Sequence, residues 1–188
     1  MGERIDINRI ARDMFILHKG EPYRVVDYEH VKPGKGQAFV RVKAKNMKTG
    51  NVVEITYKSS DTIELADFEQ RFAEYSYNDG DFYYFLDKNT YELIAVPADA
   101  VKDKAGFLKE GIDAVVYFYQ GQPIGIDLPK TVELKVVETE PARDTAGGGT
   151  KPAKLETGLV IQVPMFIKEG DIVKVNTITG QYVERVNK

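Results

Sequence analysis

The chain has 188 residues, of which 43% are hydrophobic and 29% are charged, and its formal net charge is −3. This composition is typical of a globular protein rather than a disordered one, and the absence of cysteine excludes disulfides and thiolate metal sites. No window approaches the roughly 18 apolar residues of a membrane span, and the first residues lack the apolar core of a signal peptide, so we expect a cytoplasmic protein.

The charges are unevenly distributed along the chain. Residues 1–63 carry 12 Lys or Arg and 8 Asp or Glu, residues 64–127 carry 5 and 13, and residues 128–188 carry 9 and 8. Such asymmetry suggests that one end faces a polyanion, although small domains also differ by a few charges without any such role. The acidic middle third argues against a protein that coats nucleic acid along its whole length.

Short alternating segments follow one another and predict an all-β fold. Apolar and polar residues alternate in five runs that are rich in Val, Ile, Tyr and Phe and end at turn residues, namely 39–46, 52–58, 81–88, 131–138 and 171–177. Only residues 98–111 have helical spacing, with Gly111 where a C-cap would lie. Strands this short and closely spaced are typical of small barrels or sandwiches.

Two places look like domain edges, around residues 59–67 and 127–132. They predict three blocks, 1–64, 65–127 and 128–188, each of about 60 residues. The second and third blocks also echo each other, because NDGDFYYFLDKNTYELIAV resembles KEGDIVKVNTITGQYVERV. We interpret this echo as two related barrels, although two similar meanders would also produce it by chance.

The sequence offers little for catalysis or for a cofactor. Its only histidines, His18 and His30, have no second histidine three or four residues away, and no Gly-x-Ser-x-Gly elbow occurs. The glycine-rich run 141–154 lacks the Gly-Lys-Ser/Thr ending of a phosphate-binding loop and is most simply a flexible connection. We therefore expect no enzyme, no metal site and no cofactor.

The run VKPGKGQAFV, residues 31–40, predicts a hairpin tip that leads into a strand. Pro33 stiffens one side, while Gly34 and Gly36 permit positive φ and leave Lys35 without bulky neighbours. Two interpretations stay open on physical grounds: a solubilising lysine at a turn, or an amine presented to a narrow space. Small β-barrels are common nucleic-acid platforms, but a fold alone does not establish that function.

The segment KPGKGQAFVRVK resembles the tip and following strand of bacterial translation elongation factor P. GEPYRVVDYEHV, YNDGDFYYF, GQPIGIDLP and residues 144–186 resemble the same family in the same order, so the resemblance covers essentially the whole chain. The most specific part is the C-terminal pattern, which consists of Lys151, Ala153, Gly158, Val163-Pro164, Phe166-Ile167 and Gly170.

The resemblance implies three barrels in tandem, an SH3-like or KOW-like barrel followed by two OB-fold barrels, with an L-shaped outline like that of tRNA. It implies a monomeric factor without enzymatic activity that binds the 70S ribosome, its RNA and its proteins, between the peptidyl and exit sites. There Lys35 would approach the acceptor end of the peptidyl-tRNA and promote peptide bond formation at consecutive prolines.

The resemblance also implies site residues. The residue that Lys35 matches is extended in many members by a group such as β-lysyl or aminopentanol, and some members carry a rhamnosylated arginine instead, so the resemblance implies for Lys35 an amine-type extension or none. An extension would require a modifying enzyme. The loop around Lys35 is formed by Lys32, Pro33, Gly34, Gly36 and Gln37. The tRNA and mRNA contacts of the C-terminal domain fall on Arg143, Asp144, Thr145, Gly147, Tyr182 and Arg185. One departure is NTITG, where many members have an Asp-Thr-Arg-Thr-Gly-like run, because Asn176 and Ile178 remove a charge pair.

Three alternatives were weighed against this assignment. The hypusine-bearing archaeal and eukaryotic relative has two domains, whereas this chain has a third block. The elongation factor P-like paralogue lacks the Lys-Pro-Gly-Lys-Gly tip. A generic single-strand RNA-binding module would need aromatic side chains on an exposed strand face, for which the candidates are Tyr83, Tyr84, Tyr117 and Tyr119.

Overall fold

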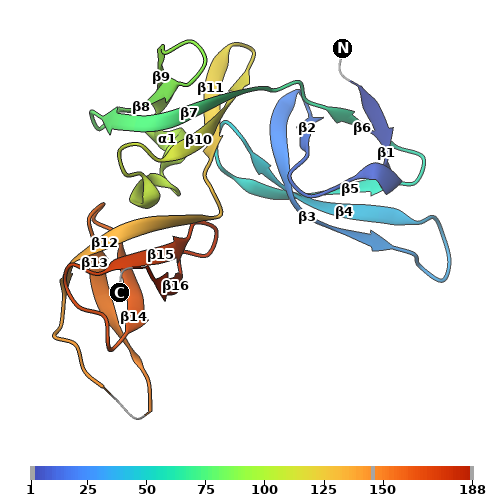
Figure 1. The fold of residues 1–188 in the computed structure, drawn as a ribbon. Coiled ribbons are helices and arrows are strands. Elements are labelled where there is room, and N and C mark those ends of the chain that lie inside the picture. Colours follow the sequence, from blue (N-terminus) through green and yellow to red (C-terminus); the bar gives the residue numbers. More distant parts are fainter. Residues whose placement is uncertain (1–2, 145–146, 187–188) are drawn as a thin grey trace. The chain divides into compact units, whose positions relative to one another are not determined.

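The computed structural model describes residues 3–144 and 147–186. Its regular structure consists of strands in three antiparallel sheets with only short helical turns, which confirms the all-β prediction (Figure 1). Within these residues, no helix is long and apolar enough to cross a membrane.

The first sheet has six strands and its own apolar core. Its order is β1 (Arg4–Asp6), β6 (Thr62–Leu65), β2 (Phe15–His18), β3 (Glu21–Val31), β4 (Phe39–Asn46) and β5 (Val52–Lys58), and a short 3-10 turn, η1 (Ile7–Arg9), follows β1. Alternation along β4 buries Val40, Val42 and Ala44 and turns the residues between them outward. The pairing of β1 with β6 joins the two ends of this segment.

The second and third sheets have five strands each. The second has the order β11 (Gln122–Asp127), β10 (Asp113–Tyr119), β7 (Glu69–Asn78), β8 (Phe82–Asp87) and β9 (Leu93–Pro97). The third has the order β14 (Val160–Pro164), β13 (Thr150–Leu155), β12 (Thr131–Thr139), β15 (Ile172–Asn176) and β16 (Tyr182–Arg185). In both, the first strand is central, the second and third lie on one side, and the fourth and fifth lie on the other.

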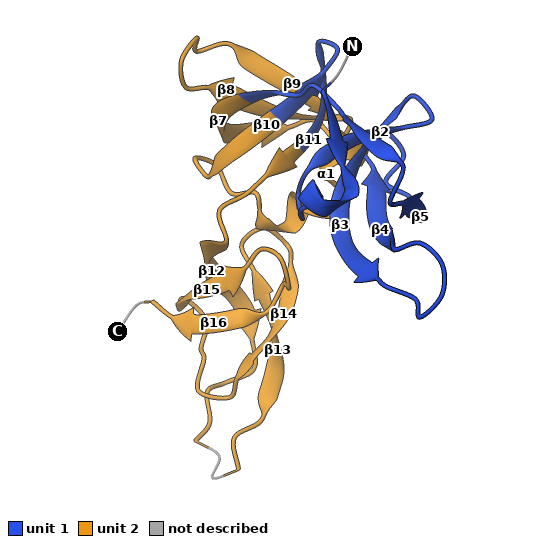
Figure 2. Ribbon diagram, turned by 90° about the vertical axis from the view of Figure 1, so that its right-hand side faces the viewer, with its two compact units in different colours: residues 1–70, 117–125 blue, residues 71–116, 126–188 orange. Residues whose placement is uncertain are grey.

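The chain divides into two compact units by its internal contacts. One unit comprises residues 1–70 and 117–125, and the other comprises residues 71–116 and 126–188 (Figure 2). The end of β10 and most of β11 therefore belong with the first unit, although they are strands of the second sheet.

The expected helix over residues 98–111 is largely absent. Only α1 (Ala98–Val101) and a 3-10 turn, η2 (Ala105–Phe107), form there. A Cβ on Gly106 would lie 3.1 Å from Leu159 Cδ1, and the Gly106 carbonyl accepts a hydrogen bond from Thr157 Oγ1 at 2.5 Å. Phe107 is buried in the core of the third sheet. Tertiary packing therefore fixes this segment, and the helical spacing reflects its buried side chains rather than a helix.

The sequence echo also has a different origin from the one expected. It aligns β8–β9, the second and third strands of their sheet, with β15–β16, the fourth and fifth strands of theirs. The two sheets do share one strand order, so they are related in topology, but the echo pairs hairpins that are not equivalent. It marks a hairpin turn that recurs in the chain, as described below.

Candidate functional site

The hairpin formed by β3 and β4 positions the tip that carries Lys35. The two strands pair from Tyr23 with Asn46 out to Val31 with Phe39, and a bulge interrupts the register between Val25 and Asp27. The long, continuous ladder carries the connecting loop, residues 32–38, to the far end of the hairpin. Ribbon views show this loop extending beyond the ends of the neighbouring strands (Figure 1).

The tip loop is fully accessible along its charged part. Lys32, Lys35 and the residues between them are exposed, as are Gly36 and Gln37. Gly36 has φ +95°, which L side chains rarely adopt, whereas Gly34 is outside that region. Only one of the two glycines is therefore required by backbone conformation. No hydrogen bond or ion pair joins the Lys35 ammonium to the rest of the described chain.

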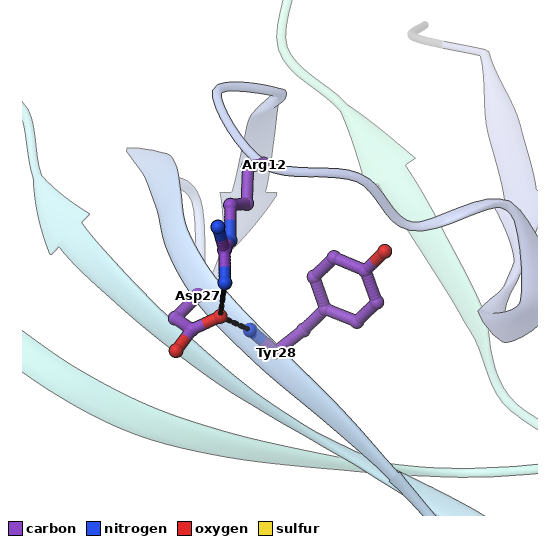
Figure 3. A network of polar contacts seen from close by, with 3 residues as sticks. All are labelled: Arg12, Asp27 and Tyr28. Atoms are coloured by element: carbon purple, nitrogen blue, oxygen red, sulfur yellow. Dashed lines mark hydrogen bonds and ion pairs between the residues drawn. The ribbon is translucent and has the colours of Figure 1, made fainter.

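A charged contact braces the hairpin at its bulge. Arg12 donates to Asp27 Oδ1 from Nη2 at 2.9 Å and from Nε at 3.1 Å, and the Tyr28 N–H donates to the same oxygen at 2.9 Å (Figure 3). The hydrogen bonds from Arg12 and from the Tyr28 backbone lower the pKa of the Asp27 carboxyl. Further along the strand, His30 is exposed and meets the Tyr28 ring edge-on at 5.6 Å.

Charges on the outer face of this hairpin lie opposite each other in complementary pairs. Arg41 lies across from Glu29, and Lys43 lies between Asp27 and Glu54. Cross-strand pairs of opposite charge offset each other's field. Arg41 and Lys43 are therefore offset by carboxylates across the strands, whereas Lys45 lies across from Arg24. The loop cations Lys32 and Lys35 lie beyond these paired positions.

In the third sheet, the loop between β12 and β13 carries the next group of predicted residues. Arg143, Asp144 and Gly147 are exposed, whereas Thr145 lies outside the described residues. The Arg143 N–H donates to the Met165 carbonyl at 3.0 Å, so the backbone of the loop is held in place at Arg143.

A buried lysine anchors the same loop. Lys151 is only 2% exposed, and its Nζ donates to the carbonyls of Glu140 and Ile167, each at 2.5 Å, and to that of Pro141 at 3.4 Å. An ammonium out of water needs such acceptors, because an unpaired buried charge is costly. Lys151 thus ties the start of the loop to the segment after β14.

Tyr182 and Arg185 lie together on β16 and are both held by neighbours. Tyr182 is half-buried against the core of the third sheet, and this burial raises the pKa of its hydroxyl. Arg185 Nη1 lies 3.9 Å from Asp171 Oδ2, and its guanidinium lies 5.4 Å from the centre of the Phe166 ring. Met165 and Phe166 therefore contact Arg143 and Arg185, respectively, and connect the two sets of predicted contacts.

Within residues 3–144 and 147–186, no group of three or more His, Asp or Glu side chains is placed to hold a metal ion. Two of the aromatic candidates for nucleic-acid stacking, Tyr117 and Tyr119, are buried. Tyr83 and Tyr84 are half-buried, on opposite faces of β8.

Three family models match the chain in sequence order. They are the elongation factor P KOW-like domain over residues 6–63, the elongation factor P OB domain over 68–126, and the elongation factor P C-terminal model over 132–185. Two proteins named elongation factor P, from Aquifex aeolicus and from a Hydrogenobaculum species, are each 70% identical to this chain over its whole length. The matched region covers 99% of the first relative and 98% of the second. The chain belongs to the elongation factor P family.

This family consists of translation elongation factors rather than enzymes. A solved structure of eukaryotic translation initiation factor 5A from Methanococcus jannaschii is also similar, with a TM-score of 0.53 over 67% of this chain and 92% of that one. Its sequence identity of 22% shows a shared fold and nothing further.

The departure from the elongation factor P pattern at NTITG leaves the turn intact. Asn176 Oδ1 accepts hydrogen bonds from the N–H groups of Ile178 at 2.8 Å and Thr179 at 3.0 Å, as an aspartate would. Asp87 makes the same two bonds between β8 and β9, and Asn46 makes them between β4 and β5. The same turn thus occurs in each sheet, and its copy between β4 and β5 was not predicted from the sequence.

Sequence reasoning missed the residues that hold the C-terminal site in place. Lys151 and Asp171 are buried polar side chains, and both belong to segments that the elongation factor P resemblance singled out. A charged residue on the same strand face as core residues, as Lys151 is with Ala153 and Leu155, is the sequence signal that identifies such an anchor.

Proposed function

We propose that this elongation factor P binds the ribosome between the peptidyl and exit sites and delivers Lys35 to the acceptor end of the peptidyl-tRNA. The observation that carries the proposal is the geometry of the tip: an exposed, unpartnered cation on a loop at the end of a long, braced hairpin. A cation presented in this way suits a site lined by phosphates.

The proposed action is to position the reactants rather than to take part in bond making. Holding the peptidyl-tRNA end in place lowers the entropic cost of aligning it with the incoming aminoacyl group. This matters most where the reactants align poorly, as at consecutive prolines. A β-lysyl or aminopentanol extension, added to Lys35 by a modifying enzyme, would carry the amine further towards that end.

The C-terminal residues would contact RNA in the same complex. Arg143, Asp144 and Gly147 lie in a loop whose start is held by Lys151, and Tyr182 and Arg185 are held by packing; Thr145, the remaining proposed contact, is outside the described residues. Residues already held in place lose less freedom on binding, which favours a contact role.

We also propose three domains, 1–64, 65–127 and 128–188, in a monomeric factor that acts in the cytoplasm. Each family model lies within one of these blocks, which supports the division.

The test is translation of a reporter with and without three consecutive prolines. Lys35→Ala should abolish the rescue of triple-proline synthesis, because the tip no longer delivers an amine. It should change folding stability by less than about 0.5 kcal/mol, because Lys35 is exposed. Lys32→Ala is the matched control and should act more weakly, through lost phosphate attraction. Full rescue by Lys35→Ala would refute the delivery mechanism.

A further inference from the structure

The outward face of strands β7, β8 and β9 is largely apolar. Their inward residues form the usual core, with Ala73, Tyr75, Phe85, Ile94 and Val96 buried. A one-sided antiparallel sheet normally places polar residues on its other face. Here that face, which we call the aromatic face, carries Phe72, Tyr77, Phe82, Tyr84, Leu86, Leu93, Ala95 and Pro97, and one carboxylate, Glu74, lies on it across from Leu86.

The aromatic face is exposed and its rings are ordered. Phe72 and Leu93 are 58% and 52% exposed. Tyr77 stacks on Tyr84 with centroids 4.6 Å apart and an angle of 18° between the rings. The Tyr84 hydroxyl donates to Asp79 Oδ2 at 2.8 Å, which holds the stacked pair in one orientation. Pre-ordered rings of this kind lose little side-chain freedom on binding.

The turn between β8 and β9 adds a strained aromatic residue beside this face. Tyr91 has φ +60° and is 76% exposed. The same turn has glycine, Gly50 and Gly180, at the corresponding position in the other two sheets. A left-handed conformation is unfavourable for a residue that carries a Cβ. Folding gains nothing from an exposed tyrosine at this position, which indicates a role outside folding.

Charge decides which class of partner fits. Glu74 lies on the aromatic face, Asp81 and Glu92 are exposed and directly precede Phe82 and Leu93, and Asp79 lies in the turn before β8. Lys88, which follows β8, is paired with Asp113. A nucleic-acid strand stacking on these rings would bring phosphates to carboxylates, whereas stacking platforms for nucleic acid lie in positive grooves. The acidic rim instead complements a cationic surface.

We propose that the aromatic face, together with Tyr91, is a docking surface for a basic protein segment. Arginine and lysine stems would pack on the stacked rings, with cation–π contacts to Tyr77 and Tyr91, while their charged ends reach Asp81 and Glu92. The inference rests on the proposed ribosomal function in one respect, because it takes the partner to be a basic protein of the ribosome.

The first test places a photo-crosslinking residue on the face. Leu93→p-benzoylphenylalanine protein is irradiated with purified 70S ribosomes, treated with nuclease and analysed by mass spectrometry. We expect a covalent product with a ribosomal protein. Val52, which is 53% exposed on β5, provides the matched control position and should not give that product. Crosslinks only to RNA, only to a second copy of the chain, or to the same protein from position 52 would overturn the proposal.

The second test measures co-sedimentation with 70S ribosomes and separates the two levels of the argument. The double variant Glu92→Lys with Leu93→Ser should bind about fivefold or more weakly than the wild type, since it removes a rim charge and an exposed anchor. The Val52→Ser control should bind as the wild type does. Unchanged binding of the double variant would overturn the docking surface alone. Failure of the wild-type chain to sediment with ribosomes would overturn both this surface and the proposed function.

Discussion

Replacing the buried Lys151 by methionine should destabilise the third sheet and release the loop that carries Arg143. Lys151→Met keeps an unbranched apolar stem but removes the ammonium that donates to Glu140 and Ile167, each at 2.5 Å. Hydrogen bonds to a charged group contribute about 1.5–3 kcal/mol each, so the two short bonds represent about 3–6 kcal/mol. Part of this is offset because an ammonium no longer has to be held out of water, and we expect a net loss of about 2–4 kcal/mol.

Native-state hydrogen exchange read by mass spectrometry resolves this loss by region. Amides of β12 to β16 should exchange faster in Lys151→Met, as should the Arg143 amide, which is bonded to Met165. The first sheet provides an internal reference. Lys154 is the matched control, because it lies on the same strand with its side chain exposed, and Lys154→Met should leave exchange unchanged. If the free energy of opening of the third-sheet amides in Lys151→Met stayed within about 0.5 kcal/mol of the wild-type value, the anchoring role would be refuted.

Three further predictions follow from single features. Gly36→Ala should reduce triple-proline rescue because its φ of +95° disfavours a side chain, whereas Gly34→Ala should retain activity in the same reporter. The pKa of Asp27 is lowered in the folded state, so its contact with Arg12 stabilises the protein near neutral pH, and this contribution is lost as the pH falls through the folded pKa. The difference in Tm between wild type and Asp27→Asn should therefore shrink on acidification. A difference that stays constant with pH would contradict the assignment. Tyr91→Gly should raise the free energy of unfolding by roughly 0.5–1 kcal/mol in urea titrations by removing left-handed strain, while Tyr91→Ala, which keeps that strain, should not.

Strand positions were predictable because alternation reports directly on a half-buried sheet. The predicted runs at 39–46 and 52–58 coincide with β4 and β5, and that at 81–88 differs from β8 by one residue at each end. The helix expected over 98–111 was wrong, because apolar residues three or four apart can also be buried by tertiary contacts. Gly106 and Phe107 pack against the third sheet, and no local signal distinguishes that case.

The candidate residues that the sequence itself singles out are those in exposed turns. Lys35 stood out because a charged residue between two glycines has no packing explanation. Lys151 stood out only through the family pattern, and its anchoring role and that of Asp171 were not predicted, because their partners lie many residues away in the sequence. The aromatic face was not predicted either, because both sides of β8 are rich in apolar residues and the sequence does not show which of these residues stay exposed.

The hairpin turn shared by all three sheets has a consequence for how the chain folds. In each copy, an Asn or Asp side chain closes the turn within three residues, so the contact forms without any long loop closure. Each sheet thus contains one turn whose contacts are local, at Asn46, Asp87 and Asn176. The first sheet is complete once β6, ending at Leu65, pairs with β1. During synthesis β5 can therefore pair with β4 at the Asn46 turn, and the first sheet, which includes the Lys35 hairpin, can close while the rest of the chain is still being made.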